Sequence, residues 1–456
     1  MIICQPSISN IIGGRLDPMF YNPKYWKIIM SIKSISHQSL GSIAQFATET
    51  WNQRDFFEES FPYIEIGAVD TLTGKIINIE NVPKKEAPSR AKKIVRQSDI
   101  IVSTTRPNRG AISYLTDIDG FCIASTGFAV IRDININDIS KEYLYIVLRL
   151  SCSLEQMIQR SSGGNYPAIT EDELKKIVIP IPSKLRQEAI IALYTKALNV
   201  KLQKDKEAKE LLESIDDYLL EALSINPSQE VSSESVFTKR ISEMIGNRLD
   251  VSFYKDRFEM VSRIYPNKRL SSIVDIDPTI RFTGLADDTP ISFIPMECID
   301  DTFGEVKEQR ETTIAQTKGY TKFEENDLLW AKITPCMQNG KSAIARNLTN
   351  GVGCGSTEYY VIRPKTDDLI IDYVYLVLRH HAVLKAAQNS FGGSAGQQRV
   401  SSQYMKSIVI PHPPIDVQKS IIETVTHKKE RAKQLQNEGS KVLEEAKATI
   451  EKMILG

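Results

Sequence analysis

Positive charge is concentrated in one stretch of this 456-residue chain, residues 84–109. Eight basic side chains stand there against two acidic ones, Glu86 and Asp99, in a chain of zero formal net charge. Basic groups neutralise phosphates, and arginine also forms paired hydrogen bonds with guanine. The stretch therefore predicts contact with a polyanion through a local patch, although a charged run can equally be a solvated face. Its basic residues are Lys84, Lys85, Arg90, Lys92, Lys93, Arg96, Arg106 and Arg109.

Amide and hydroxyl side chains form a second set of candidates. Asn108 stands inside the basic stretch, and Asn165 and Tyr166 follow the glycine pair 163–164. A second glycine pair, 392–393, precedes another polar run; we interpret both pairs as turns, with close approach to a phosphate as the alternative. Amides suit adenine, and hydroxyls and amines suit phosphates. The candidates in the second half are Lys332, Gln338, Asn339, Lys341, Ser394, Gln397, Gln398 and Arg399.

Catalytic and cofactor motifs are weak or absent in the sequence. Residues 22–25 resemble a methyltransferase loop, but no glycine-rich cofactor loop follows a strand, so we interpret them as a turn. Asp277, Glu305 and Lys307 have the spacing of a nuclease triad, which is common by chance. No GxxxxGK[ST] loop, CxxC pair or histidine cluster is present, so we expect no ATP, metal or catalytic site.

The composition is typical of a soluble intracellular protein. The N-terminus lacks the features of a signal peptide, and no run of 18 apolar residues occurs. Six irregularly spaced cysteines argue against a disulfide framework. We therefore expect a cytoplasmic chain with no membrane partner.

The sequence contains an internal repeat. Residues 177–182, with the sequence IVIPIP, return 231 positions later as IVIPHP at 408–413. Tyr143 to Arg149 matches Tyr373 to Arg379 at an offset of 230, and Arg15-Leu16-Asp17 recurs at an offset of 233. A repeat of this size indicates two copies of one domain rather than a solenoid.

Each copy begins as mixed α/β and ends in a long helix. Apolar runs bounded by turn residues predict strands at 62–69, 99–105 and 128–131, with counterparts at 291–299, 327–333 and 359–362. Helical periodicity is present at 141–159 and 371–387, and a short helix precedes each IPxP segment.

The long helices carry a heptad pattern. The second runs from Ile421 to Met453 in steps of four and three, and the same phase from Ile190 to Ala222 holds in the first. We expect the two helices to pair antiparallel; the alternative is that each packs only on its own domain. Small residues such as Gly439 would permit close approach, whereas Lys204 and Lys428 would weaken the seam.

Two globular units, each closed by an IxIPxP segment, a glutamine (Gln187 or Gln418) and a heptad helix, resemble the specificity subunit of type I restriction-modification systems. The entry segments at 15–21 and 248–254 and the Asp-apolar-apolar strands at Asp99 and Asp327 also resemble that family. The resemblance covers nearly the whole chain. It implies an α+β fold in which two similar α/β target-recognition domains are separated by a pair of long antiparallel coiled-coil helices with pseudo-two-fold symmetry.

The resemblance also implies function. Each domain would read half of a split, asymmetric site in double-stranded DNA, and the helices would set the spacing and dock two methyltransferase subunits, with restriction subunits joining them. S-adenosylmethionine, ATP and Mg²⁺ would belong to those partners and none to this chain, which would not itself be an enzyme. The implied boundaries are 1–182 and 236–413 for the domains, 183–225 and 414–456 for the helices, and 226–235 for a linker.

Two other classes of function stay open from the residues alone. One is a self-contained nuclease or methyltransferase with degenerate motifs, and the other is a coiled-coil adaptor for proteins. Steep salt dependence of DNA binding separates the first interpretation from the adaptor.

Overall fold

The chain folds as two compact units. The structure is a computed structural model that describes residues 17–52, 54, 58–118, 120–226, 258–392 and 398–456. Unit one comprises Met1–Lys206 with Leu435–Gly456, and unit two comprises Glu207–Gln434. Each unit therefore contains one globular copy of the repeat and a part of both long helices.

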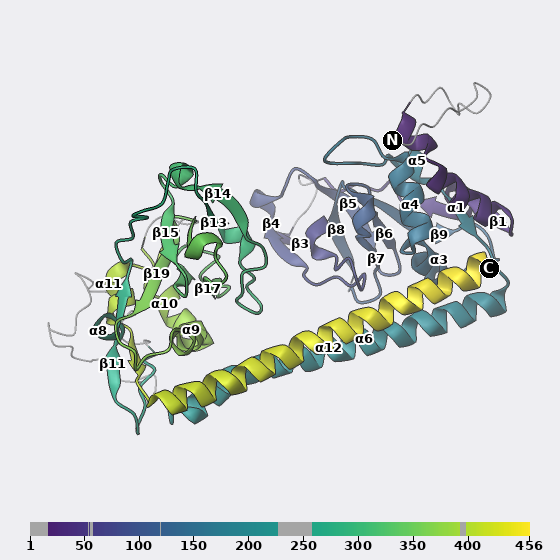
Figure 1. The fold of residues 1–456 in the computed structure, drawn as a ribbon. Coiled ribbons are helices and arrows are strands. Elements are labelled where there is room, and N and C mark those ends of the chain that lie inside the picture. The colour runs from purple at the N-terminus through teal and green to yellow at the C-terminus, as the bar shows by residue number, and fades with distance from the viewer. Residues whose placement is uncertain (1–16, 53, 55–57, 119, 227–257, 393–397) are drawn as a thin grey trace. The chain divides into compact units, whose positions relative to one another are not determined.

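Unit one contains two four-stranded sheets, with strand orders β2-β9-β6-β7 and β4-β3-β8-β5, and a two-stranded pair, β1-β10 (Figure 1). The strands are β1 His37–Ser39, β2 Ala44–Phe46, β3 Ser60–Ile64, β4 Glu80–Pro83, β5 Ala91–Arg96, β6 Ile100–Ser103, β7 Ile112–Tyr114, β8 Phe121–Ser125, β9 Phe128–Ile134 and β10 Val178–Pro180. The helices are α1 Pro23–Lys33, α2 Leu40–Ile43, α3 Lys141–Leu148, α4 Ser151–Arg160, α5 Glu171–Leu174 and the start of α6 Lys184–Ala222.

Unit two repeats this arrangement, with sheets β12-β19-β16-β17 and β14-β13-β18-β15 and the pair β11-β20. Its strands are β11 Asn267–Arg269, β12 Val274–Ile276, β13 Pro290–Ile294, β14 Arg310–Thr313, β15 Thr321–Glu324, β16 Leu328–Ala331, β17 Ser342–Ile344, β18 Val352–Gly355, β19 Tyr359–Pro364 and β20 Val409–Pro411. Its helices are α8 Leu270–Ile273, α9 Ile371–Arg379, α10 His381–Gln388, α11 Ser402–Ser407 and the start of α12 Ile415–Leu455.

Strand β6 shows why these sequences build three layers. Alternate residues of a strand point to opposite faces. Ile100 and Val102 pack with the helices in one apolar cluster, whereas Ile101 packs in a second cluster with residues of the other sheet. The first sheet is therefore buried on both faces, which explains a continuous apolar run in place of apolar and polar alternation.

An aspartate precedes β6 and its counterpart β16, and each aspartate forms a buried ion pair with an arginine. Asp99 accepts hydrogen bonds from Arg132 Nε and Nη2 at 3.1 and 3.0 Å. In unit two Asp327 accepts from Arg363 at 2.7 and 2.8 Å. The aspartate of the Asp-apolar-apolar pattern thus has a structural role, because its ion pair with an arginine holds the start of the strand in place.

Four predicted elements, two helices and two strands, differ from the structure. The segment 141–159 is not one helix but two, α3 and α4, because Leu150 is extended and the Arg149 side chain is drawn inward to backbone carbonyls. Segment 371–387 is broken in the same way, at His380. The predicted strands 62–69 and 291–299 end early, at Ile64 and Ile294, where a 3₁₀ turn follows in each copy.

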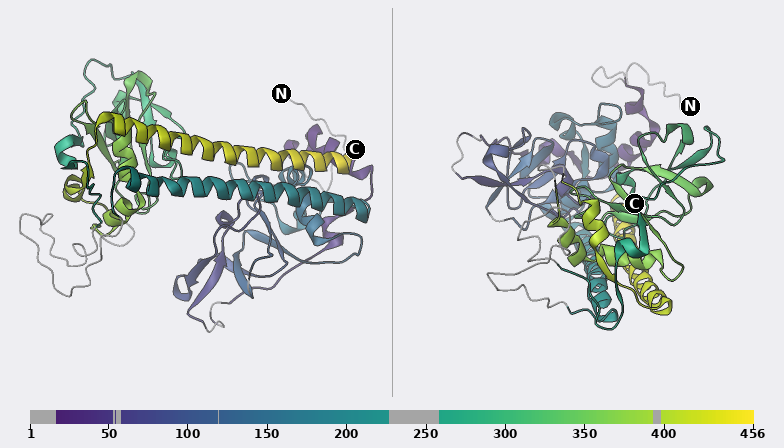
Figure 2. Two further views of the ribbon diagram at one scale, coloured as in Figure 1. Left: turned by 90° about the horizontal axis from the view of Figure 1, so that it is seen from below. Right: turned by 90° about the vertical axis from the view of Figure 1, so that its left-hand side faces the viewer.

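The long helices pair antiparallel and also join the domain cores. In unit one the start of α6, through Ile190 and Tyr194, shares a cluster with the end of α12, through Leu443 and Ile450 (Figure 2, teal and yellow). In unit two the end of α6 shares a cluster with the start of α12. Helix pairing and packing on the domains, posed as alternatives from the sequence, therefore occur together.

The polar positions of the seam make specific contacts. At Gly439 a Cβ atom would lie only 3.2 Å from the Lys201 Cα, so the predicted close approach is confirmed. Lys204 forms an ion pair with Glu438 at 2.6 Å across the two helices, and Lys428 donates to Ser214 Oγ at 2.7 Å. Because each ammonium has a partner on the opposite helix, these lysines also fix register.

No helix in the described part of the chain combines the length and the apolar character needed to cross a membrane.

Candidate nucleic-acid interface

Three loops meet at one end of the sheets in unit one. Thr104 N–H donates to Gly127 O at 2.8 Å, and Arg106 N–H donates to Pro167 O at 2.7 Å. A bridge between Thr105 and Ala168 reinforces the second contact. We call the assembly of 104–110, 125–127 and 161–168 junction one.

Junction one brings together candidates that lie 60 residues apart in the sequence. The Arg106 guanidinium carbon lies 4.0 Å from the centre of the Tyr166 ring, and Tyr166 is 70% exposed. Asn108, Arg109 and Asn165 are exposed around this pair. Arg90 is held beside the same loops because Thr126 N–H donates to its carbonyl at 2.8 Å. Exposed cations and amides on converging loops are suited to a nucleic acid.

The basic stretch does not form one patch. Strands β3 and β8 are parallel, Pro83 pairs with Ser60 at the start of β3, and Ala91 pairs with Ser125 at the end of β8. Strands β4 and β5 form the two edges of this sheet. Lys84 and Lys85 follow β4, whereas Arg90, Lys92 and Lys93 lie at the start of β5, so the two groups lie at opposite edges and opposite ends of the sheet. The structure separates these candidates into two groups.

Some of the basic side chains already have partners. Lys93 lies 3.7 Å from a Glu171 carboxylate oxygen, and Arg96 lies 2.7 Å from one of Glu49. Lys85, Arg90 and Lys92 are exposed. Positive charge available to a polyanion is therefore smaller than the sequence surplus of six suggests.

Unit two builds the same junction with different side chains. Lys332 N–H donates to Glu358 O at 2.9 Å, Thr334 N–H donates to Gln398 O at 3.0 Å, and Ile333 bridges Arg399. We call the assembly of 332–341, 356–358 and the described part of 390–400 junction two. Gln338 and Asn339 are exposed on its loop, whereas Ser394 and Gln397 lie outside the described residues.

The cations of junction two are engaged within the protein. Arg399 donates from Nε and Nη2 to the two Glu358 carboxylate oxygens at 2.8 Å each, and this contact lowers the pKa of Glu358. Lys332 Nζ donates to Tyr359 O at 3.4 Å, and Lys341 Nζ donates to Met296 O at 3.3 Å. Junction two therefore presents amides rather than cations at its exposed loop.

Sequence reasoning missed the residues that hold each junction in place. Arg149 is buried and donates to Ile112 O and Leu72 O at 2.7 Å each, to Thr71 O at 3.2 Å and to Tyr194 Oη at 3.1 Å. It thereby ties the strand after the 104–110 loop to the 70–74 turn and to α6. Its repetition as the last residue of the Tyr143 to Arg149 motif was the available signal.

Arg379 has the same role in unit two. It donates to Asp301 O at 2.8 Å and to Gly340 O at 2.5 Å, at the end of the 332–341 loop. The turn that it holds requires glycine, because Gly304 has φ +69° and a Cβ there would lie 2.1 Å from Tyr375 Oη. Gly74 repeats this requirement in unit one.

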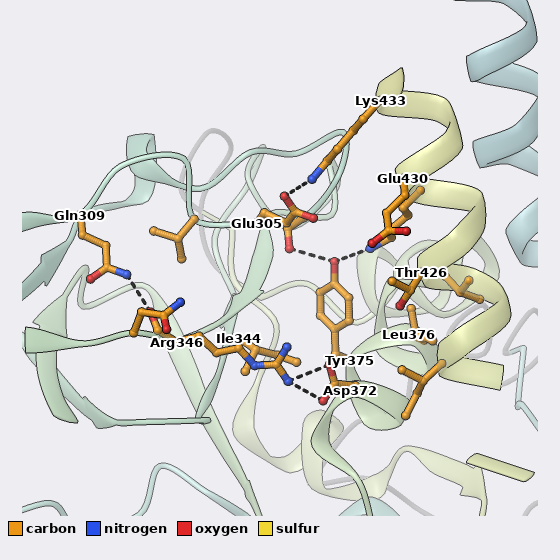
Figure 3. Close-up of a pocket in the computed structure, with 16 residues that line it drawn as sticks. Glu305, Gln309, Ile344, Arg346, Asp372, Tyr375, Leu376, Thr426, Glu430 and Lys433 are labelled. Atoms are coloured by element: carbon orange, nitrogen blue, oxygen red, sulfur yellow. Dashed lines mark hydrogen bonds and ion pairs between the residues drawn. The ribbon is translucent and has the colours of Figure 1, made fainter. Parts of the chain in front are cut away.

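A polar cavity of about 400 Å³ lies in unit two between the domain and α12 (Figure 3). Arg346 and Asp372 form an ion pair on one side, and Lys433 pairs with Glu305 on the other. Lys429 donates to Phe303 O and Tyr375 Oη at 2.9 Å each, and its burial lowers its pKa to about 7. Leu198 stands 231 positions earlier, so the first long helix carries no ammonium at the corresponding position.

The residues of the nuclease-like triad are engaged separately. Lys307 pairs with Asp300 at 3.1 Å, Glu305 pairs with Lys433, and Asp277 accepts from Val361 N–H at 3.1 Å. Within the described residues no group of His, Cys, Asp or Glu has the geometry to hold a metal ion. The arrangement therefore offers no support for a nuclease centre at these positions.

The architecture is thus a duplicated α/β domain, joined by long paired helices, that carries the same loop junction twice with different side chains. One family profile, described as "Type I restriction modification DNA specificity domain", matches residues 23–213 and 267–445. These segments make up most of the chain. The chain belongs to this family, and the domain occurs in it twice.

Curated relatives are similar over part of the chain. The EcoEI specificity subunit of Escherichia coli is 38% identical over 156 residues, which are 34% of this chain and 26% of that protein. The EcoAI specificity subunit of E. coli is 35% identical over 190 residues, 41% of this chain and 31% of that protein. The HindI specificity subunit of Haemophilus influenzae is 30% identical over 188 residues, 40% and 39% of the two chains. The alignments thus span about a quarter to two fifths of the relatives' own length.

Two solved structures are also similar. One belongs to a study of the assembly and conformational transition of a type I R-M system, with 20% identity and a TM-score of 0.48. The other is the HsdS subunit of Thermoanaerobacter tengcongensis, with 21% identity and a TM-score of 0.36. Both alignments cover 92% of this chain and 96% of the other.

Proposed function

We propose that this chain is the DNA-recognition subunit of a type I restriction-modification complex. Each unit reads one half of a split, asymmetric sequence in double-stranded DNA, and α6 with α12 set the spacing between the halves. The observation that supports this most is the duplication of one loop junction with different exposed side chains. Recognition of two different half-sites requires two domains of the same fold whose loops carry different side chains.

The proposed DNA contacts follow the exposure and pairing of each candidate. In unit one Arg106, Asn108, Arg109, Asn165 and Tyr166 contact bases or nearby phosphates, with Arg90, Lys92 and Lys93 on the flanking phosphates. Lys84 and Lys85, at the opposite sheet edge, are assigned to a more distant phosphate. In unit two the amides contact bases and the cations support the loop; the candidates there are Lys332, Gln338, Asn339, Lys341, Ser394, Gln397, Gln398 and Arg399.

The partners follow from the family. Two methyltransferase subunits dock on the chain and restriction subunits join the complex, so that S-adenosylmethionine, ATP and Mg²⁺ act in those subunits. The domains span 1–182 and 236–413, the helices span 183–225 and 414–456, and 226–235 links the halves. The complex works in the cytoplasm, which fits the free, buried Cys122, Cys152, Cys298 and Cys354.

Selection from randomised DNA duplexes tests the function. The full chain, purified from its own host with bound partners, is mixed with random duplexes, and bound DNA is sequenced. We expect a motif of two defined blocks at fixed separation, with an affinity that falls steeply as salt rises. Bound DNA without any split motif would refute the proposal. Affinity that does not change with salt would instead support a protein adaptor.

A further inference from the structure

The Arg106 backbone in junction one adopts a conformation that is unusual for its residue type. Its φ and ψ are +48° and +54°, in the left-handed region that arginine rarely occupies. The conformation is held from both sides, because its N–H donates to Pro167 O at 2.7 Å and Pro107 fixes the next residue. Such strain persists where the surroundings impose it, and it concentrates at ligand clamps.

The Arg106 side chain is ordered by stacking instead of by an ion pair. Its guanidinium lies 4.0 Å from the centre of the Tyr166 ring. Among the residues that the structure describes, no carboxylate lies within ion-pair distance of it. Stacking occupies the face of the planar group and leaves its N–H edge for other acceptors. The side chain is therefore oriented before any ligand arrives.

The equivalent position in junction two carries no such group. Thr334 N–H donates to Gln398 O as Arg106 N–H donates to Pro167 O, so the two positions correspond. The arginine of junction two, Arg399, uses Nε and Nη2 on Glu358. Gly127 in unit one corresponds to Glu358, because the Gly127 carbonyl accepts from Thr104 N–H as the Glu358 carbonyl accepts from Lys332 N–H. Unit one therefore has no side chain where unit two has this carboxylate. Unit one thus lacks both members of this ion pair, because Ala168 corresponds to Arg399 and Gly127 corresponds to Glu358.

We propose that Arg106, oriented by Tyr166, is the specificity-determining residue that reads a guanine in the half-site bound by unit one. This inference rests on the proposed function. A planar fork with its N–H edge open matches the paired O6 and N7 acceptors of guanine in the major groove. A phosphate contact would not need the orientation that the strained backbone and the stacked ring together impose, since phosphates accept from many directions.

The test is selection from randomised duplexes with the full chain and five variants, one of which, Arg106→Ala, removes the guanidinium altogether. Arg106→Lys keeps the charge but loses the planar fork and its stacking. Tyr166→Leu removes the ring, and Tyr166→Phe keeps it. Arg96→Lys is the matched control, because Arg96 is an arginine of unit one that pairs with Glu49 at 2.7 Å and is not among the proposed DNA contacts.

In the wild type we expect one guanine position in one block of the split motif to depend on Arg106. Arg106→Lys lowers discrimination at that position by roughly ten- to hundredfold, while the other block keeps its preference and shows that the chain is folded. Tyr166→Leu weakens the preference for guanine at the same position, and Tyr166→Phe and Arg96→Lys do not.

Three outcomes overturn the inference. Unchanged guanine preference in Arg106→Lys would exclude base reading by this side chain. A uniform loss of affinity in Arg106→Ala, with a shallower salt slope and an unchanged motif, would make Arg106 a phosphate contact. In both cases the proposed function stands. Absence of a split motif in the wild type would instead overturn the proposed function, and the inference with it.

Discussion

Lys429 is a partly buried ammonium whose removal should stabilise unit two at low pH. In the unfolded chain its pKa is near 10.5, and burial lowers the pKa to about 7 in the folded protein. At pH 6 both states are protonated, so the folded state carries the full cost of the buried charge. Between the two pKa values the unfolded chain binds a proton that the folded chain lacks, and stability therefore rises with pH.

The magnitude follows from the pKa shift and the lost hydrogen bonds. A shift of about 3.5 pH units at roughly 1.4 kcal/mol per unit sets a ceiling of about 5 kcal/mol. Lys429→Met removes this cost but also removes the donors to Phe303 O and Tyr375 Oη, at about 1.5 kcal/mol each. We expect Lys429→Met to be about 2 kcal/mol more stable than the wild type at pH 6 and to lose this advantage by about pH 9.

The assay uses a tryptophan in the same core. Trp330 is buried in the cluster that contains Val425, and the chain has three tryptophans. In a Trp26→Phe/Trp51→Phe background, the Trp330 fluorescence reports unfolding of unit two in urea at each pH. Lys433→Met is the control, because this half-exposed ion pair contributes less than about 1 kcal/mol. The Lys433 charge adds to the lowering of the Lys429 pKa, so this variant should keep the rise of stability with pH but make it smaller. A Lys429→Met variant less stable than the wild type at pH 6, or a difference constant from pH 6 to pH 9, would refute the reasoning.

Three further predictions concern the anchors and the helices. Arg149→Met should destabilise unit one by roughly 3–5 kcal/mol, because several buried carbonyls lose their donor; a midpoint of urea unfolding within experimental error of the wild type would contradict this. Asp327→Ala should cost unit two a similar roughly 3–5 kcal/mol by leaving Arg363 without its buried partner, whereas Glu324→Ala, on the exposed side of the same arginine, should cost less than about 1 kcal/mol; equal losses measured by Trp330 fluorescence would show that burial does not decide. Removal of one heptad from each helix, residues 200–206 and 436–442, should shorten the rod by about 10 Å and the preferred half-site spacing by roughly three base pairs in duplex selection, and unchanged spacing would exclude the ruler.

The repeat made much of the fold predictable from the sequence. Heptad periodicity predicted helices over Ile190 to Ala222 and Ile421 to Met453, and the structure has helices at Lys184–Ala222 and Ile415–Leu455. Apolar runs located the central strands β6 and β16, because a strand that is buried on both faces has apolar residues at consecutive positions. The break between α3 and α4 was not predictable, since both halves keep one helical periodicity and a tertiary contact of Arg149 interrupts them.

The sequence by itself determined that two similar α/β domains with diverged loops are joined by helices that need partners. Those properties depend on local periodicity and on comparing the chain with itself. Only the tertiary structure decided that Lys84 and Lys85 lie far from Arg90. It likewise decided that Glu358 forms an ion pair with Arg399 and that Arg106 stacks on Tyr166. Each of these depends on strand order or on contacts between residues 41 or more positions apart, and residue type alone carries no signal for them.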